Sequence, residues 1–153
     1  MTQLTANSIP PDTDFSHSPT SLNSFAPRLL DWFAENGRHD LPWQQHQTDT
    51  PNPYIVWLSE VMLQQTQVTT VLPYFARFMD TFPTVQNLAA AEWDTVAEHW
   101  AGLGYYARAR NLHKGAKQLV EVIDETGDFP QTLAGWEAIS GVGPSTAGAI
   151  MAM

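Results

Sequence analysis

Apolar side chains recur every three or four residues along most of this sequence, and strict alternation of apolar and polar residues is nearly absent. The first spacing gathers apolar residues on one face of a helix, whereas alternation would indicate strands. We therefore predict an all-α fold. The expected helices cover residues 25–36, 53–66, 68–82, 84–91, 92–100 and 107–126, followed by a helix, a glycine hairpin and a second helix over residues 136–150.

The first 24 residues depart from this pattern. They are rich in Ser, Thr, Pro and Asn and carry few apolar residues, a composition typical of disordered segments. We expect a disordered tail over residues 1–24 and a helical domain over residues 25–153. The last helix reaches Met153 without a cap, a glycine or a charged last turn, so we expect this domain to be incomplete and to continue beyond Met153.

Composition narrows the class of protein. The 153 residues suffice for one domain, or for one domain and part of another, and six Trp with seven Phe can supply a core. The absence of cysteine excludes disulfides, thiolate metal sites and iron–sulfur ligation within this chain. The start has no signal-peptide pattern and no apolar run reaches about 18 residues, so we expect a soluble, cytoplasmic protein that does not enter membranes.

The charge is acidic but unevenly distributed. A formal net charge of −9 argues against indiscriminate binding to nucleic acid, which depends on Lys and Arg. Four of the seven basic residues nevertheless lie on one predicted helix: Arg108, Arg110, Lys114 and Lys117. Because the apolar residues of that helix occupy another side, we expect these cations to face outward. They form either a basic surface for DNA or an ordinary solvated helix face.

Glu60 is the one charged residue in the mostly apolar run over residues 57–67. No Lys or Arg occurs between Arg38 and Arg77, so no cation is close in sequence. Burial without a cation disfavours the carboxylate and raises its pKa, which makes Glu60 a candidate general acid. The alternative is a carboxylate in the first helical turn with Ser59 as the cap. An Asn-Pro start at residues 52–53 argues against it, because Glu60 then lies two turns in.

Two glycine motifs suggest binding to another molecule. Residues 101–107, AGLGYYA, formally match a dinucleotide fingerprint, but that motif follows a strand and a helix is expected here. We interpret them as a tight turn that presents a tyrosine. Residues 141–150, GVGPSTAGAI, indicate a hairpin whose backbone amides, with those of the next helix, can receive a phosphate. The alternative is an ordinary pair of helices joined by a short turn.

Four blocks in this order resemble a known family. They are LPW at residues 41–43, WLSEVMLQQTQV at 57–68, GLGYYARARNLHK at 102–114 and GVGPSTAGAI at 141–150. Over about residues 30–153 the chain resembles the adenine DNA glycosylases, often called MutY, of the helix-hairpin-helix base-excision repair superfamily. The resemblance implies an endonuclease III-like fold. It also implies hydrolysis of the base–sugar bond of adenine mispaired with 8-oxoguanine or guanine in double-stranded DNA, by a monomer that flips the adenine into a pocket.

The resemblance also assigns roles to individual residues. Glu60 matches the catalytic acid, and the adenine pocket matches Arg38, Leu41, Trp43 and Leu63. The wedge that enters the base stack on the 8-oxoguanine side matches Gln64, Gln65, Thr66 and Tyr105. The hairpin that grips phosphate matches Gly141, Val142, Gly143 and Ser145, and the cations expected to face DNA are Arg108, Arg110 and Lys114.

Ser145 separates two related activities. The endonuclease III branch carries a lysine there that forms a Schiff base and cuts the strand, and a serine cannot form that imine. We therefore expect a monofunctional glycosylase, with an endonuclease III-type lyase or a non-catalytic DNA-binding module as alternatives.

In the family, a catalytic aspartate, four cysteines that hold a 4Fe–4S cluster and an 8-oxoguanine-reading domain follow this region. We expect the cluster in the full-length family member and no cofactor or metal in this chain. Ser140 also replaces the proline usual before the hairpin. Because the aspartate lies outside these residues, we expect the 153-residue chain alone to be inactive.

Overall fold

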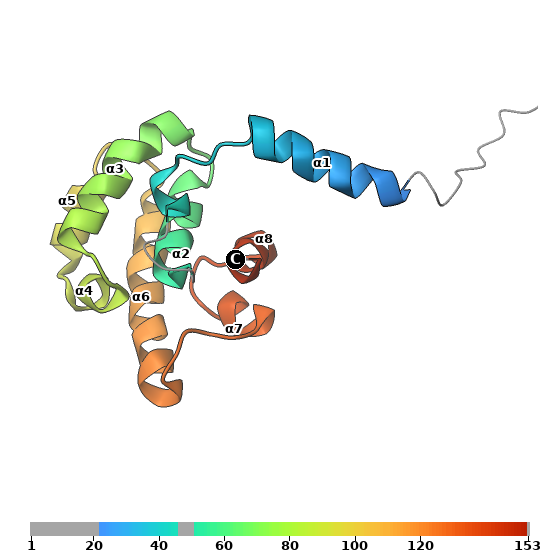
Figure 1. The fold of residues 1–153 in the computed structure, drawn as a ribbon. Helices are drawn as coiled ribbons and strands as arrows, with labels where there is room; N and C mark the ends of the chain where they lie inside the picture. Colours follow the sequence, from blue (N-terminus) through green and yellow to red (C-terminus); the bar gives the residue numbers. More distant parts are fainter. Residues whose placement is uncertain (1–21, 46–50, 153) are drawn as a thin grey trace, which may run out of the picture. The chain divides into compact units, whose positions relative to one another are not determined.

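The computed structural model of this chain describes residues 22–45 and 51–152. Within these ranges it contains α-helices and one short 3-10 helix and no strand, as expected (Figure 1). The elements are α1 (Leu22–Asn36), η1 (Pro42–Gln44), α2 (Pro53–Leu63), α3 (Val68–Thr81), α4 (Val85–Ala90), α5 (Trp93–Trp100), α6 (Tyr106–Thr126), α7 (Leu133–Glu137) and α8 (Pro144–Met151).

The chain divides into two units, residues 1–38 and residues 39–153. The first contains α1, which begins at Leu22, three residues before the expected start. The tail expected over residues 1–24 falls almost entirely outside the described residues. All other helices belong to the second unit, which holds the residues of the four sequence blocks.

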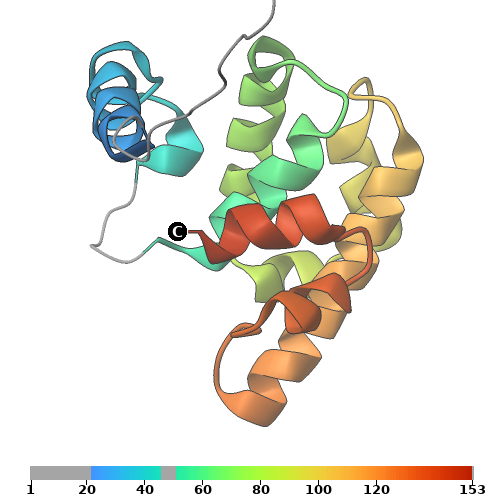
Figure 2. The ribbon, with the colours of Figure 1, turned by 90° about the vertical axis from the view of Figure 1, so that its right-hand side faces the viewer.

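Helix α2 lies among the other helices of the second unit and contacts α3, α6 and α8 (Figures 1 and 2). Its side chains Trp57, Leu58, Val61 and Met62 are almost completely buried. A helix that is apolar on nearly every side belongs in a core. This composition explains why α2 is the central helix and why a carboxyl group on it is partly removed from water.

Capping residues account for the ends of α2. Asn52 is the N-cap as expected, and its side chain accepts a hydrogen bond from the Tyr54 amide at 3.0 Å. The helix ends at Leu63, about three residues earlier than the sequence predicted. The cause is the backbone beyond it, because Gln64 has a ψ of 114° and Gln65 has a positive φ of 58°.

The hairpin between α7 and α8 packs against the long helix α6. The Ser140 amide donates to the Gln118 side chain at 2.8 Å, and Gly141, with a φ of 80°, lies directly against Asn111. A Cβ on Gly141 would lie 2.8 Å from the Cβ of Asn111, so both the space and the backbone angle require glycine. Figure 2 shows α8 lying across α2, with α7 beside it. This packing brings the hairpin next to the helix that carries Glu60.

Candidate active site and nucleic-acid interface

Glu60 lies in the last turn of α2 and is half-buried. Burial raises the pKa of Glu60, and no cation contributes to the shift. Within the described residues no ion pair involves its carboxylate, so the absence of a local cation in the sequence extends to the folded chain. A carboxyl group in this setting stays protonated to higher pH than an exposed glutamate, which suits a proton donor.

The alternative role for this carboxylate is wrong. Ser59 does not cap a helix start: it is buried, and its hydroxyl donates to the Val56 carbonyl at 2.8 Å within α2. Glu60 lies seven residues after Pro53, where α2 begins. The amides of a first helical turn are therefore not the partners of Glu60.

A groove of about 380 Å³ joins Glu60 to the start of α8. Its lining comes from the end of α2 and the beginning of the hairpin helix: Glu60, Leu63, Gln64, Gly143, Pro144, Ser145 and Thr146. The Gln64 side-chain Nε2 donates to the Thr146 hydroxyl at 3.4 Å, which links the two walls. Ser145 is exposed and belongs to the wall of the groove that the start of α8 forms.

The hairpin presents backbone amides beside this groove. The Val142 side chain is buried and its amide donates to the Ile139 carbonyl at 3.1 Å, which fixes the turn. The first hydrogen bond of α8 runs from the Ala147 amide to the Gly143 carbonyl at 2.9 Å. The amides of Ser145 and Thr146 precede it and have no partner within the helix. Such amides, at the positive end of a helix dipole, can receive an anion.

Arg108 does not face outward, so this part of the prediction is wrong. Its guanidinium points toward the end of α2 and the loop that follows. There it donates to the carbonyl oxygens of Val61 at 3.1 Å, Met62 at 2.8 Å and Gln64, and to the Thr66 hydroxyl at 3.0 Å. The last carbonyls of a helix lack intrahelical donors, and a cation there also complements the dipole. Burial lowers the pKa of Arg108, and the neighbouring Tyr105 opposes this shift.

The other cations of α6 are exposed, as predicted. Arg110, Lys114 and Lys117 lie on the solvent side of the helix, and the Arg110 guanidinium lies 5.8 Å from the centre of the Trp93 ring. These three side chains remain available for phosphate groups.

Gln65 and Tyr105 share an unusual backbone. They are the non-glycine residues with positive φ in the described part of the chain, at 58° and 52°. For a bulky residue this conformation costs about 1–3 kcal/mol and persists only where the surroundings impose it. Both side chains are exposed, Tyr105 by 60%. The sequence block gave no sign of this geometry.

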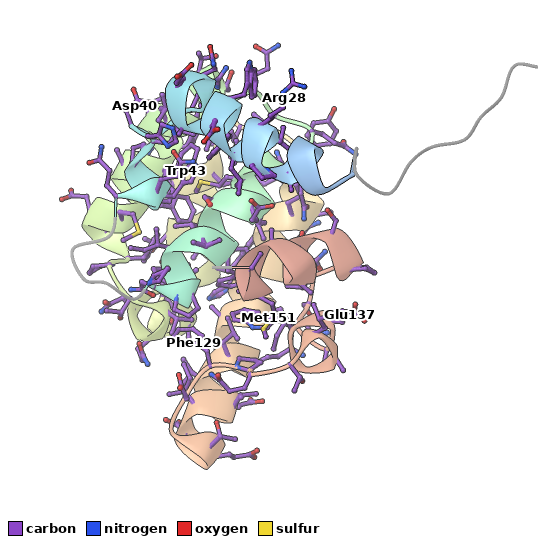
Figure 3. The ribbon with its side chains drawn as sticks, turned by 45° about the vertical axis from the view of Figure 1, so that its right-hand side comes forward. Arg28, Asp40, Trp43, Phe129, Glu137 and Met151 are labelled. Carbon is purple, nitrogen blue, oxygen red and sulfur yellow. The ribbon has the colours of Figure 1, made fainter. Side chains whose placement is uncertain are left out.

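The residues expected around adenine are described one by one, because Arg38 belongs to the first unit and the other three to the second. Leu63 lines the groove beside Glu60, and Leu41 is half-buried against the core. Trp43 is buried on η1 and packs edge-on against Phe75, with ring centres 5.2 Å apart (Figure 3). Arg38 is exposed at the end of the first unit. The adenine pocket therefore stays a prediction.

An iron–sulfur cluster does not fit this chain, because the sequence offers no cysteine thiolate. No cluster of three or more His, Asp or Glu side chains suitable for a metal occurs in residues 22–45 and 51–152. None of the described helices is long and apolar enough to cross a membrane.

The groove, the hairpin and the all-α fold agree with the family comparison. The sequence profile of the HhH-GPD superfamily base excision DNA repair proteins matches residues 58–149, and the chain belongs to this superfamily.

The curated relatives narrow the comparison. The chain is 45% identical over 127 residues to an adenine DNA glycosylase of Buchnera aphidicola subsp. Baizongia pistaciae, and 44% identical over 134 residues to that of Homo sapiens. These matches cover 83% and 84% of the chain but only 34% and 24% of the relatives. The chain thus spans about a third or less of the length of the relatives it matches.

Solved structures support the fold. A thermostable thymine-DNA glycosylase superposes with a TM-score of 0.73 at 22% identity, covering 86% of this chain and 58% of the other. Endonuclease III in a non-covalent DNA complex gives 0.66 at 18% identity, with 89% and 59% covered. At these identities the likeness establishes the architecture alone.

Proposed function

We propose that this chain carries the proton-donating part of an adenine DNA glycosylase, which hydrolyses the base–sugar bond of adenine opposite 8-oxoguanine or guanine. The observation that carries the proposal is the groove in which a half-buried Glu60, with its raised pKa, faces the first turn of α8. The identity of 42–45% to adenine DNA glycosylases of several organisms supports this choice of substrate.

The chemistry follows from a neutral carboxyl group beside a flipped purine. Glu60 donates its proton to a ring nitrogen of the adenine, which then leaves as a neutral base when the bond between its N9 and the sugar C1′ breaks. An oxocarbenium-like sugar develops, and water adds to C1′ and gives up a proton, which returns the Glu60 carboxylate to its acid form, to leave an abasic site. Leu63 supplies an apolar contact within the same groove. Arg38, Leu41 and Trp43 remain proposed pocket residues.

Contacts with the DNA backbone come from two surfaces. The hairpin at Gly141–Gly143 and the first turn of α8 can bind one phosphate, and the exposed cations of α6 can bind others. Gln65 and Tyr105, with Gln64 and Thr66 beside them, form the proposed wedge that replaces the flipped base in the stack. The protein acts as a monomer in the compartment that holds the DNA, the cytosol in a bacterium.

The test is Glu60→Gln in the complete protein that contains these residues. Single-turnover release of adenine from an A:8-oxoguanine duplex should fall by about 10²–10⁴-fold while duplex affinity is kept. Glu98→Gln, an exposed glutamate on α5, is the matched control and should leave the rate unchanged. Wild-type rates in Glu60→Gln would instead identify a DNA-binding module whose chemistry does not use this carboxyl group.

Ser145 distinguishes hydrolysis from lyase chemistry. It occupies the groove position where a Schiff-base lysine would be needed, and its hydroxyl cannot form an imine. Borohydride should therefore trap no covalent adduct between the complete protein and its DNA product. A trapped adduct would contradict the monofunctional assignment and favour the endonuclease III-type lyase.

A further inference from the structure

The Arg108 guanidinium connects two loops that are about 40 residues apart in sequence. One loop follows α2 and contains Gln65; the other precedes α6 and contains Tyr105. On the first side, Arg108 donates to the carbonyl of Gln64 and to the hydroxyl of Thr66, the two neighbours of Gln65. Its contacts thus hold the peptide on each side of the left-handed residue.

On the second side, the same guanidinium lies over the Tyr105 ring, 5.3 Å from its centre, and over the Trp100 ring at 5.3 Å. The Trp100 indole donates to the Gly104 carbonyl at 2.8 Å, and the Arg108 amide donates to the Tyr105 carbonyl at 2.9 Å. Arg108 therefore contacts the Tyr105 residue through both its ring and its backbone.

Arg108 also supplies hydrogen bonds to carbonyl groups in the last turn of α2. The Glu60 carbonyl accepts from the Gln64 amide and the Leu63 carbonyl from the Thr66 amide, both at 3.2 Å. The two carbonyls between them, of Val61 and Met62, accept from Arg108. A lysine keeps the charge but has one nitrogen and no planar fork, so it cannot reproduce these contacts together.

We propose that Arg108 is a positioning residue that locks the Gln65 and Tyr105 loops together, so that both side chains enter the base stack as one rigid wedge. The proposal rests on the proposed function, because it assigns a cause to the geometry of that wedge. It differs from a direct contact with DNA: the two terminal nitrogens of the guanidinium donate to protein oxygens and its Nε is buried, so the group is not offered to phosphate.

The experiment measures unstacking separately from binding. The complete protein is titrated onto a duplex that contains 8-oxoguanine opposite 2′-fluoro-2′-deoxyadenosine, whose fluorine blocks formation of the cationic sugar, with 2-aminopurine beside the 8-oxoguanine. At saturation, wild-type protein should raise the 2-aminopurine fluorescence as the wedge separates the bases. Arg108→Lys should bind within about threefold of wild type but lose at least half of this rise per bound complex.

The matched control is Arg77→Lys. Arg77 also donates to a backbone carbonyl, His99 O at 2.7 Å, and lies 5.0 Å from a tyrosine ring centre, that of Tyr74, but it touches neither wedge loop. It should leave the fluorescence rise unchanged. If Arg108→Lys does not fold, as judged by circular dichroism, Thr66→Val removes the 3.0 Å contact with Arg108, together with the 3.4 Å hydrogen bond from the Thr66 hydroxyl to the Gln64 carbonyl, and should lose part of the rise.

The outcomes are separable. If wild-type protein neither binds nor unstacks this duplex, the proposed function fails. If wild type unstacks the duplex and a folded Arg108→Lys, or failing that Thr66→Val, does so fully, the locking role is overturned. Arg108→Gln removes the charge: if it reduces the slope of log K against log salt by about 1 while unstacking stays full, Arg108 contacts a phosphate and the locking role is also overturned.

Discussion

The protonation of Glu60 depends on the burial of the helix that carries it. Glu60 is partly dehydrated because its helix is buried on nearly every side. Arg108, which lies at the end of that helix, donates to its carbonyl oxygens. Desolvation therefore raises the pKa of this carboxyl group and favours its neutral form, and no cation opposes the shift. This follows from the apolar composition of α2.

The raised pKa of Glu60 makes a prediction about stability. Folding raises the pKa of Glu60 above its value in the unfolded chain, so the folded chain binds more protons than the unfolded chain between these two pKa values. The stability of the fold therefore falls as pH rises through this range. Glu60→Gln removes this titration. The melting temperature of Glu60→Gln should therefore exceed that of wild type at neutral pH.

Thermal melts from about pH 3.5 to 8 measure the difference between the two proteins. The difference should shrink as pH falls, and below the ordinary glutamate pKa of about 4.5 the neutral acid and the amide should be nearly equivalent. A wild-type melting temperature above that of Glu60→Gln at neutral pH, falling toward it as pH falls, would show that the carboxylate is stabilised in the fold, contrary to this account.

Helices were the best predicted part of the structure. Asn52 caps α2 where the sequence placed it, and Thr84 and Gly127 cap α4 and α6 close to the predicted helix ends, because short polar side chains and glycine act on adjacent backbone groups. The end of α2 was misplaced and Arg108 was wrongly expected to face outward for one reason. The contact between them spans more than 40 residues, and no local spacing encodes it.

Close packing between helices gives a second prediction. A Cβ on Gly115 of α6 would lie 2.9 Å from the Trp57 ring and 3.0 Å from Ile139, whereas a Cβ on Gly148 of α8 meets nothing within 4 Å. Gly115→Ala should destabilise the chain by about 1–3 kcal/mol through overpacking. Gly148→Ala should stabilise it by about 0.5–1 kcal/mol through helix propensity.

Urea unfolding of the two variants beside wild type provides the measurement. Opposite signs support the packing of α6 against α2 and the hairpin. Equal stabilisation by both alanines would mean that α6 stands farther from Trp57 than described.

Most of the basic residues of the second unit lie on α6, where they precede the acidic residues of the same helix. The chain carries a formal charge of −9, yet Arg110, Lys114 and Lys117 are exposed together. The sequence predicted that these three cations face outward, and it predicted the hairpin. It could not predict the groove between Glu60 and Ser145, because that groove requires α8 to lie against α2.

This charge distribution predicts how DNA binding depends on salt. If Lys114 neutralises one phosphate, Lys114→Gln should weaken binding similarly for matched and mismatched duplexes and reduce the slope of log K against log salt by about 1. Fluorescence anisotropy between 50 and 200 mM salt tests this, with Arg77→Gln on α3 as the comparison. An unchanged slope in Lys114→Gln would place the DNA on another surface.

The pH dependence of adenine release tests most directly whether Glu60 is the proton donor. In the complete protein, the single-turnover rate constant on an A:8-oxoguanine duplex should fall as pH rises past the elevated pKa of Glu60, since only the protonated acid donates. Glu60→Gln should lack this limb and be slower by about 10²–10⁴-fold at acidic pH. A Glu60→Gln protein that keeps both the wild-type rate and the same pH profile would contradict the assignment.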